Sequence, residues 1–580
     1  MRIEVQAHAG RENKQASGIR IGALLLALVA GPAAYADTPA IPAGAPTPGQ
    51  VQSTLPTTVA PPAPKAAPLI TTPPPIATTV PPGGPTVTVQ QFVITGNTVY
   101  TTDVLEAEIA SYVGKDLTLA DLYKVADVLT RFYQVHGYGV ARVTIPEQEL
   151  TGGSVALQVV EGRIGKVSVE GATRTRADVI AGQASALKTG DVYTDPAMDR
   201  SVLLVNDLPG VQAQAVLQPG DDFGTADVVY KVSEDPEYSG QLSLDDYGRA
   251  DTGRWRLNAE ADVASITGSG DKLSASMSHS QGNLLNFGGL NYSAPFGAPG
   301  GRLSVDYNQS EYRVGGPVFT PLELSGSSKN GGVSYAYPEE RSRADNLYLT
   351  IGMQHEGSKS AVKGQTVTDT DINLLQLGFF YNLVHDDGSS FSLNGSFAGN
   401  GLRNDGNRNS AERARLELDS SYYMPIADGW SFISRGAGVW SPDPLSDTEK
   451  YSLGGPDNVR GFNSAEVRGD SGLFASAELQ RSLAPALPFA LGFYVDSGKV
   501  WSKSFVTLVT GKDSSGKIVT VPQTTPGSER VLSSVGVEAI FQSSDKRWES
   551  RLEWAYAVSS YKASDGENGG HLWFTCGMNF

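Results

Sequence analysis

The stretch WRLNAEADV, residues 255–263, alternates strictly between two kinds of side chain. Apolar residues take every second position and polar residues fill the positions between them: Trp255, Leu257, Ala259, Ala261 and Val263 against Arg256, Asn258, Glu260 and Asp262. Successive side chains of a β-strand point to opposite faces, so this pattern predicts a strand with one apolar face and one charged face.

The same period of two continues to the end of the chain. Further apolar sets are Leu273, Ala275 and Met277; Leu303, Val305 and Tyr307; Leu347, Leu349, Ile351 and Met353; Leu416 and Leu418; and Leu552, Trp554, Tyr556 and Val558. A soluble β-sandwich also alternates, but so rich a polar face on so many strands favours a transmembrane barrel with a wet lumen. We count sixteen strands between Gly240 and Phe580. The predicted fold of residues 236–580 is therefore an all-β transmembrane barrel of sixteen antiparallel strands.

The connections between these strands alternate in length. ITGSGDK, HDDGSS and SSDK are short, whereas residues 441–470 and the stretch around 503–527 are long. In outer-membrane barrels short turns lie in the periplasm and long loops lie outside. This assignment places both the preceding region and the C-terminus in the periplasm.

The last strand, HLWFTCGMNF, ends on an aromatic residue. It places Leu572, Phe574, Cys576, Met578 and Phe580 on one face. The ending resembles the terminal signal by which barrel proteins are recognised for membrane insertion, with Phe574, Met578 and Phe580 as its residues and the barrel assembly machinery as the implied partner. The alternative is simply a last apolar strand.

The N-terminal 86 residues predict export followed by a linker. A basic segment, the apolar run from Ile21 to Ala30 and the small-x-small pattern at Ala34 to Ala36 predict a signal peptide over residues 1–36. The apolar run is too short to span a bilayer, which needs about 20 residues. Residues 37–86 hold 15 of the 34 prolines, which favours an extended, proline-rich linker.

Charge and cysteine content exclude some classes of protein. The full chain carries a formal net charge of −17. Residues 1–36 hold four basic and two acidic side chains, so the chain without them carries about −19. No nucleic-acid partner is expected for so acidic a protein. The single cysteine, Cys576, rules out an internal disulfide, so an exported protein of this size needs another source of stability, such as a large sheet.

Residues 87–235 contain one pattern twice. Each copy has a strand ending in a turn, two helical segments and two strands, and Gly171 of the second copy follows Gly96 of the first by 75 positions. The pattern predicts two small α+β modules, at 87–163 and 164–235.

These modules resemble the polypeptide-transport-associated (POTRA) domains of outer-membrane transporters. HGYGVARVTIPEQEL, LQVVEGRIGKVSVEG and NDLPGVQAQAVLQPG are similar to segments of the two-partner secretion transporters, the ShlB/FhaC/HecB haemolysin secretion/activation family. The resemblance implies an outer-membrane protein, in contact with outer-membrane lipid, whose periplasmic POTRA domains receive a large unfolded exoprotein of the adhesin or haemolysin type. It also implies export through the barrel without nucleotide.

Two rival functions use related parts. An assembly factor for outer-membrane proteins shares the barrel but usually carries more POTRA domains, and a passive porin carries none. Two modules therefore favour secretion.

The POTRA sheets offer a physical means of recognition, because unpaired edge groups can accept an extended peptide as an added strand. The candidate edges are YGVARVTI and VQAQAVLQ, and the alternative is that the modules are spacers or scaffolds. Family members often begin with a helix that plugs the barrel. Residues 37–86 are too rich in proline for such a helix, so no helical plug is expected.

No motif for catalysis or metal binding emerges. GKDSSGKI, at 511–518, has the spacing of a phosphate-binding loop, but Ile518 replaces the Ser or Thr that binds magnesium and a strand pattern follows. The histidines are scattered singly, without HExxH or CxxC. We therefore expect no enzyme activity, no cofactor and no metal, with an outer-membrane esterase or protease as the alternative.

The loop segment GGPDNVRGF raises the question of where Arg460 lies. Val459 and Phe462 would waste apolar area at an exposed tip, and Gly461 permits a tight reversal, so loop 441–470 is predicted to fold into the lumen. A buried arginine needs a partner.

In GFYVDSG the period of two points Gly492, Tyr494, Asp496 and Gly498 into the lumen, and Asp496 is the predicted partner of Arg460. The family resemblance implies the same contact between the loop motif Val459-Arg460-Gly461-Phe462 and the barrel wall. Gly492 and Gly498 are expected to leave room for the loop backbone to approach the wall. The alternative is that Arg460 only fills a turn or forms a surface salt bridge, and such exposed pairs are worth at most about 1 kcal/mol.

Overall fold

A computed structural model describes residues 45–55, 70–71, 84–150, 152–400, 414–484, 487–512, 518–564 and 570–580. The predicted signal peptide, most of the proline-rich linker and residues 513–517 of the glycine-rich fragment lie outside these ranges. Among the described residues, no helix has the length and apolar character needed to cross a membrane.

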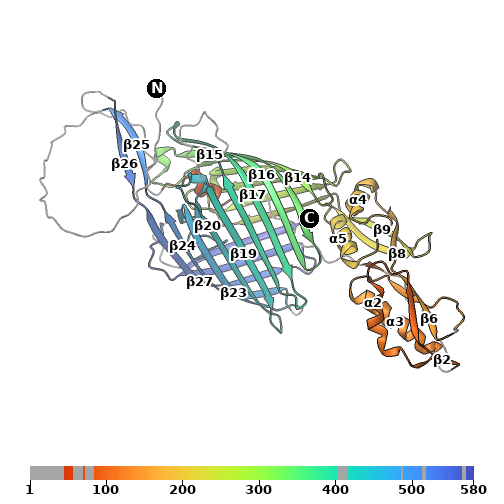
Figure 1. Cartoon of the computed structure of the whole chain (residues 1–580). Coiled ribbons are helices and arrows are strands. Elements are labelled where there is room, and N and C mark those ends of the chain that lie inside the picture. The colour runs from red at the N-terminus through yellow and green to blue at the C-terminus, as the bar shows by residue number, and fades with distance from the viewer. Residues whose placement is uncertain are drawn as a thin grey trace, which may run out of the picture.

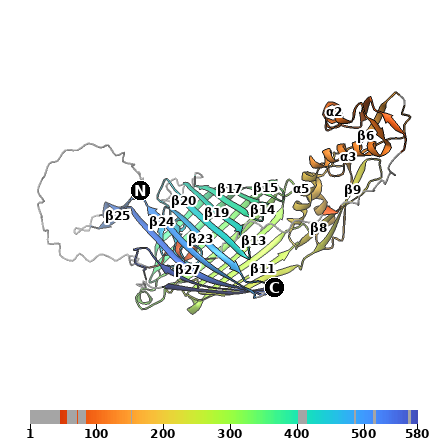
Figure 2. The same ribbon diagram turned by 90° about the horizontal axis from the view of Figure 1, so that it is seen from below.

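The dominant element is a closed barrel (Figures 1 and 2). Each strand pairs antiparallel with the next, and β10 closes on β29. This confirms the predicted barrel of sixteen antiparallel strands. Its strands are β10 (Tyr238–Asp245), β11 (Arg256–Ala264), β12 (Lys272–Ser280), β13 (Leu285–Pro295), β14 (Arg302–Arg313), β15 (Ser325–Arg341), β16 (Asp345–Val362), β17 (Gln365–Val384), β18 (Ser390–Gly399), β19 (Ala414–Pro425), β20 (Trp430–Trp440), β23 (Ser471–Ser482), β24 (Phe489–Ser502), β27 (Ser528–Gln542), β28 (Trp548–Ala557) and β29 (Gly570–Asn579).

Strand β24 illustrates the two faces of the wall. Leu491, Phe493 and Val495 are 50%, 53% and 45% exposed, whereas Tyr494 and Asp496 are fully buried. The apolar side chains therefore cover the outer surface and the polar ones point into the lumen, as the period of two requires.

The chain ends at the barrel seam. Strands β10 and β29 pair over five residues, from Gln241 with Asn579 to Asp245 with Thr575. Beyond that ladder, Gly240 and Phe580 exchange two backbone hydrogen bonds of 3.0 Å. A Cβ on Gly240 would lie 2.6 Å from the Phe580 ring, so glycine leaves room for the terminal aromatic side chain.

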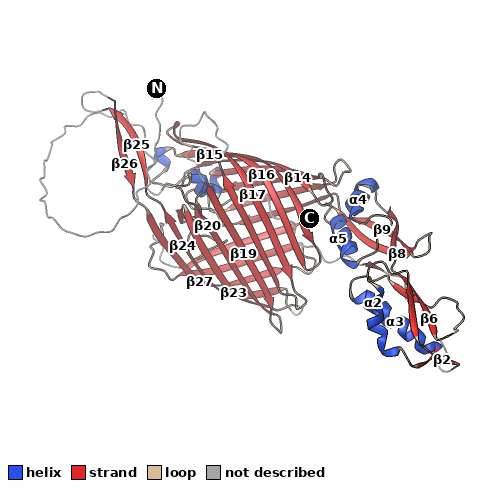
Figure 3. Ribbon diagram, in the orientation of Figure 1, coloured by secondary structure: helices blue, strands red, loops and turns tan. Residues whose placement is uncertain are grey.

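The two predicted α+β modules are present, and Figure 3 shows most of the helix of the molecule within them. The first contains β2 (Thr86–Thr88), β3 (Gln91–Thr95), α2 (Thr102–Ile109), η1 (Ala110–Tyr112), β4 (Asp116–Thr118), α3 (Leu119–Val135), β5 (Arg142–Thr144) and β6 (Ser154–Val160), with sheet order β3-β6-β5. The second contains β7 (Arg163–Glu170), α4 (Ala177–Gln183), η2 (Ala184–Ala186), α5 (Asp195–Asn206), β8 (Val211–Pro219) and β9 (Thr225–Glu234), with β8-β9-β7 in its sheet.

The two modules share more than their element order. Gly96 and Gly171 both have positive φ, and a Cβ there would lie 2.3 or 2.5 Å from a carbonyl oxygen of Val159 or Val232. In each module a glutamate at or just after the end of the last strand accepts hydrogen bonds from the backbone that follows this glycine. Glu161 accepts from the Val99 amide at 2.7 Å, and Glu234 accepts from the Thr175 amide at 2.9 Å. The repeat is therefore a repeat of contacts as well as of pattern.

The proline-rich linker contains structure that the sequence analysis did not expect. Residues 48–52 form the helix α1 (Pro48–Gln52), which packs against η5 (Asp447–Glu449) of the long loop (Figure 1). No helical plug was expected from so much proline, yet a five-residue helix forms here, because Pro48 stands at the first helical turn, where proline is tolerated, and Thr47 with Gln50 forms a capping box. Ala45 and Val51 are buried against Leu285 and Tyr312 of the barrel wall.

A second piece of the linker pairs with a POTRA sheet. Strand β1 (Ile70–Thr71) runs parallel to β8, with Ile70 opposite Ala215 and Thr71 opposite Val216. One of the two predicted edges, VQAQAVLQ, is therefore already partly covered by the chain itself.

Candidate functional site

The loop of residues 441–470 folds into the barrel. It contains η5, β21 (Tyr451–Leu453) and β22 (Val467–Gly469), and the last two pair with each other. Val459 and Phe462 are fully buried in a cluster with Leu453, Phe474 and Leu532. The apolar members of the loop motif thus pack against the barrel wall.

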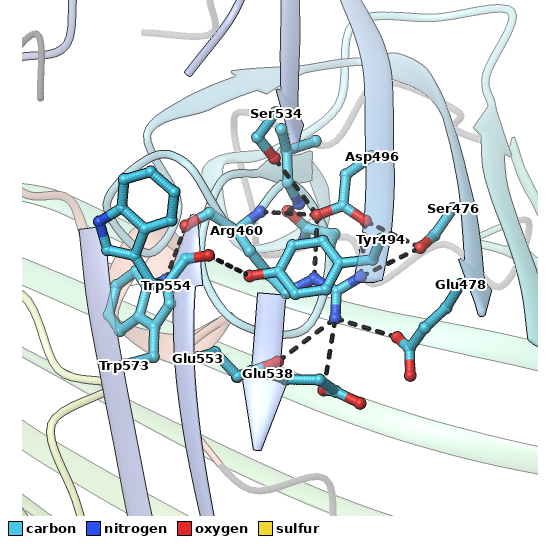
Figure 4. A network of polar contacts seen from close by, with 12 residues as sticks. Arg460, Ser476, Glu478, Tyr494, Asp496, Ser534, Glu538, Glu553, Trp554 and Trp573 are labelled. Atoms are coloured by element: carbon cyan, nitrogen blue, oxygen red, sulfur yellow. Dashed lines mark hydrogen bonds and ion pairs between the residues drawn. The ribbon is translucent and has the colours of Figure 1, made fainter. Parts of the chain in front are cut away.

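Arg460 lies against Asp496 (Figure 4). Its Nε and Nη2 donate to the two carboxylate oxygens at 2.9 Å each, and its backbone N–H donates to Oδ2 at 3.2 Å. Both side chains are fully buried. The pair is a bidentate ion pair, the geometry in which arginine binds carboxylate most strongly.

Tyr494 supports the same guanidinium from one face. The guanidinium carbon lies 3.1 Å from the centre of the Tyr494 ring, and the tyrosine hydroxyl donates to the Trp554 carbonyl at 3.3 Å. A Cβ on Gly536 of the neighbouring strand would lie 2.4 Å from the Tyr494 ring. Glycine at that position is what allows the ring to lie flat beneath the arginine.

Several residues of the site were missed by the sequence analysis. Arg460 Nη1 donates to Glu478 at 3.2 Å and to Glu553 at 3.3 Å, and lies 3.8 Å from Glu538. Two hydroxyls also bind Asp496, from Ser476 at 2.8 Å and from Ser534 at 3.2 Å. These residues come from β23, β27 and β28. Their inward direction follows from the period of two, but their height on the wall depends on strand register.

The charges of this site are unequal. Four carboxylates surround Arg460, and Arg551 is a further cation, 3.5 Å from Glu538 and 3.9 Å from Glu553. Removing Arg460 would leave Asp496 buried without its cation, and an uncompensated buried charge costs about 3–5 kcal/mol. The site therefore holds the loop firmly to the wall, and its ligand is the loop itself.

Gly492 and Gly498 make room for other groups than the sequence predicts. A Cβ on Gly498 would lie 2.7 Å from the side chain of Leu453, and one on Gly492 would lie 2.6 Å from the side chain of Glu538. Both glycines accommodate side chains, not the loop backbone as predicted. Within the loop motif, a Cβ on Gly461 would lie 2.6 Å from Ser534.

The last external connection covers the loop motif. Tyr561 contacts the Phe462 ring edge-on at 6.0 Å, and Ser564 donates through its amide to Glu466 at 2.6 Å. From the final strand, Trp573 Nε1 donates to the Arg460 carbonyl at 2.7 Å. The loop is thus held from both the wall and the seam side of the barrel.

The N-terminal helix is attached to the other end of the loop. The Gly49 amide donates to Asp447 at 2.7 Å, and Arg468 donates to Asp447 at 2.6 Å and to Thr47 at 2.9 Å. Gln50 Nε2 donates to the Ala465 carbonyl at 3.0 Å. Loop and helix form one body inside the barrel.

The predicted C-terminal residues lie on the outer side of β29. Leu572 of the same face is 49% exposed and Phe580 is 65% exposed, and Phe574 lies 6.2 Å from Trp255 across the seam. Met578 pairs with Leu242 of β10.

Among the described residues, no group of three or more His, Cys, Asp or Glu side chains is arranged to hold a metal ion.

Family models match two parts of the chain. Residues 224–511 match the model described as haemolysin secretion/activation protein ShlB/FhaC/HecB, and residues 87–162 match the POTRA domain of ShlB type. The chain is 27% identical to a heme/hemopexin transporter protein, HuxB, of Haemophilus influenzae (strain 86-028NP), over 68% of this chain and 72% of the relative. It is 26% identical to the outer membrane transporter CdiB of Escherichia coli, over 73% and 74% of the two chains.

Two solved structures share the fold over most of the chain. CdiB from Escherichia coli aligns with a TM-score of 0.66 at 19% identity, covering 92% of this chain and 96% of that one. CdiB from Acinetobacter baumannii aligns with a TM-score of 0.61 at 18% identity, covering 86% and 91%. With the barrel, the POTRA modules and both model matches in agreement, the chain belongs to the ShlB/FhaC/HecB haemolysin secretion/activation family, the outer-membrane transporters of two-partner secretion.

Proposed function

We propose that this transporter exports one large, unfolded exoprotein of the adhesin or haemolysin type from the periplasm to the outside. The observation that carries the proposal is a closed barrel with an internal loop and helix, joined to two POTRA modules. Relatives named as heme/hemopexin and hemolysin transporters support the class of cargo. Folding of the exoprotein outside supplies the drive, and no nucleotide takes part.

The edge strand β8 of the second POTRA domain is the better of the two proposed docking edges. In the first domain β5 has only three residues, its Val143 amide donates to Thr130 at 2.9 Å, and Pro146 follows without an N–H. In the second domain β8 runs from Val211 to Pro219. A peptide strand pairs along a row of backbone groups, and β8 is the longer of the two edges.

The exoprotein must displace part of the linker to use this edge. The Ala213 amide and carbonyl both bind Asn206 of α5, at 3.0 and 2.9 Å, so they point away from β9. By alternation the backbone groups of Ala215 and Leu217 also point outward. Among the described residues, strand β1 lies opposite Ala215 and Val216, so an exoprotein strand on this edge would take the place of β1 there.

Deletion of the gene tests the function. We expect one large protein to disappear from the culture medium, while the amounts of other outer-membrane proteins stay unchanged. Complementation with the intact gene should restore the secreted protein. A general loss of outer-membrane proteins would instead support an assembly factor, and an unchanged medium would contradict secretion.

Removal of Phe580 tests the proposed C-terminal assembly signal. The residue closes the seam by two backbone hydrogen bonds to Gly240 and presents an exposed ring at the barrel end. We expect a several-fold lower amount of barrel in the outer membrane, with secretion per inserted molecule unchanged, because the barrel assembly machinery would recognise the chain poorly. Phe580→Tyr keeps the aromatic ring and is the control. Equal membrane amounts of all three proteins would contradict the proposed signal.

A further inference from the structure

The second POTRA domain is attached to one side of the barrel mouth. Its contacts fall on the turns at residues 265–271 and 296–301 and on the end of β15 with the turn into β16, residues 338–346. The Arg176 amide donates to the Gly268 carbonyl at 3.0 Å, and Gln183 accepts from the Gly300 amide at 2.6 Å. Figure 1 shows α5 beside the ends of β14 and β16. The domain is thus tied to strands β11 to β16.

Arg341 forms the strongest of these contacts. Its Nε and Nη2 donate to the two oxygens of Asp207, at 2.8 Å each, and its Nη1 donates to Asn346 at 2.8 Å. Tyr348 donates to the same aspartate at 3.3 Å. The arginine side chain is only 6% exposed, so water screens this pair far less than a surface pair.

Two further arginines cross the interface in opposite directions. Arg343 of the barrel turn donates to Asp199 of α5 through Nε at 2.9 Å and Nη2 at 2.8 Å. Arg200 of α5 donates back to the Pro338 carbonyl at 2.7 Å. Helix α5 therefore engages both the end of β15 and the turn that follows it.

Packing and chain connection restrict the domain further. A Cβ on Gly300 would lie 2.6 Å from Leu204, and one on Gly270 would lie 2.7 Å from Leu208, so the two leucines fit against turns that have no side chain there. Strand β9 ends at Glu234 and β10 begins at Tyr238, which leaves only three residues between domain and barrel. A connection this short permits little swing, because each residue spans at most about 3.5 Å.

We propose that the second POTRA domain stays docked on this side of the mouth while the exoprotein passes, with Arg341 and Arg343 as the positioning residues. Docking keeps β8 at a fixed place beside the pore entrance, and the exoprotein enters by the side of the mouth formed by β17 to β28. The proposal rests on the proposed function, since it assigns the domain a place during transport.

A disulfide between domain and barrel tests this. The Thr175 and Ser265 hydroxyls lie 2.8 Å apart and both side chains are buried, so cysteines at these positions are close enough to bond. The double variant Thr175→Cys/Ser265→Cys is made with Cys576→Ser, and bond formation is read by mobility on non-reducing gels. We expect equal secretion with and without reductant. Each single-cysteine variant is a control for the substitution itself.

Secretion that stops in the oxidised protein and returns with reductant would overturn the proposal and leave the proposed function intact. The proposed function has a separate test. It fails if deletion of the gene removes no protein from the medium, whether or not the disulfide forms.

The double cysteine variant could fail to secrete both with and without reductant. In that case an exchange of charges between Arg341 and Asp207 tests the proposal. Arg341→Ala should lower secretion several-fold without lowering barrel amount, and Arg341→Asp with Asp207→Arg should restore it. Arg341→Lys should recover only part, because lysine cannot form the bidentate contact. Normal secretion by Arg341→Ala would show that Arg341 does not position the domain.

Discussion

Arg460→Ala and Asp496→Ala should each reduce secretion at least about tenfold, the effect of roughly 1.4 kcal/mol, and the double variant should be little worse than either. Each single change leaves one buried charge without its bidentate partner, at 0% exposure for both side chains. We expect this to destabilise the loop in its position on the barrel wall by about 3–5 kcal/mol. The measurement is secreted exoprotein per inserted barrel.

Matched variants separate this effect from a general loss of charge. Arg460→Lys keeps the charge but loses the two parallel hydrogen bonds and the flat stacking on Tyr494, so we expect an intermediate defect. Lys499 lies on β24, the strand of Asp496, and pairs with Glu529 of β27 at 2.8 Å. The side chains of this pair are 45% and 69% exposed, and Lys499→Ala removes the pair. Exposed pairs contribute about 0–1 kcal/mol, so secretion should stay near normal.

Two results would contradict the paired role. One is normal secretion by Arg460→Ala. The other is defects that multiply in the double variant, as they would for independent sites. Glu478 and Glu553 each accept one hydrogen bond from Arg460, whereas Asp496 accepts two from the guanidinium. Their single glutamine variants should therefore have smaller effects than Asp496→Ala.

The Arg460–Asp496 ion pair was predictable because two simple rules apply to it. The period of two points Asp496 inward, and a buried arginine requires an anion. Glu478, Glu538 and Glu553 were missed because their position opposite the loop depends on the register of β23, β27 and β28. Register is fixed by pairs such as Glu478 with Tyr494, which no single strand reveals.

The helix α1 was missed for a different reason. A helix of five residues is too short to be stable alone, and its stability comes from contacts with Asp447 and Arg468, some 400 positions away in the chain. Composition describes the average of residues 37–86, whereas the Thr47-Pro48 start of the helix is a local exception. The pairing of Ile70 with β8 is equally non-local.

Deleting residues 87–235 should abolish export while leaving a barrel that inserts and conducts ions. The physical reason is that recognition and pore have separate cores. The buried clusters of the first and second POTRA domains contain no barrel residue, and the two barrel clusters contain no POTRA residue. Arg341 and Arg343, freed of their aspartates, would face periplasmic water at little cost. The measurements are outer-membrane amount, conductance in planar bilayers and exoprotein in the medium.

A point substitution distinguishes recognition from scaffolding within the same prediction. Ala215→Pro removes one outward-pointing N–H of β8 and spares the ladder to β9, so it should lower export strongly without changing barrel amount. Ala215→Val adds comparable bulk at this fully buried position but keeps the N–H, and export should be largely retained. If the modules are only spacers or assembly scaffolds, the two substitutions should behave alike and the deletion should lower barrel amount together with export. Export by the truncated barrel would show that the POTRA domains are not where the exoprotein is recognised.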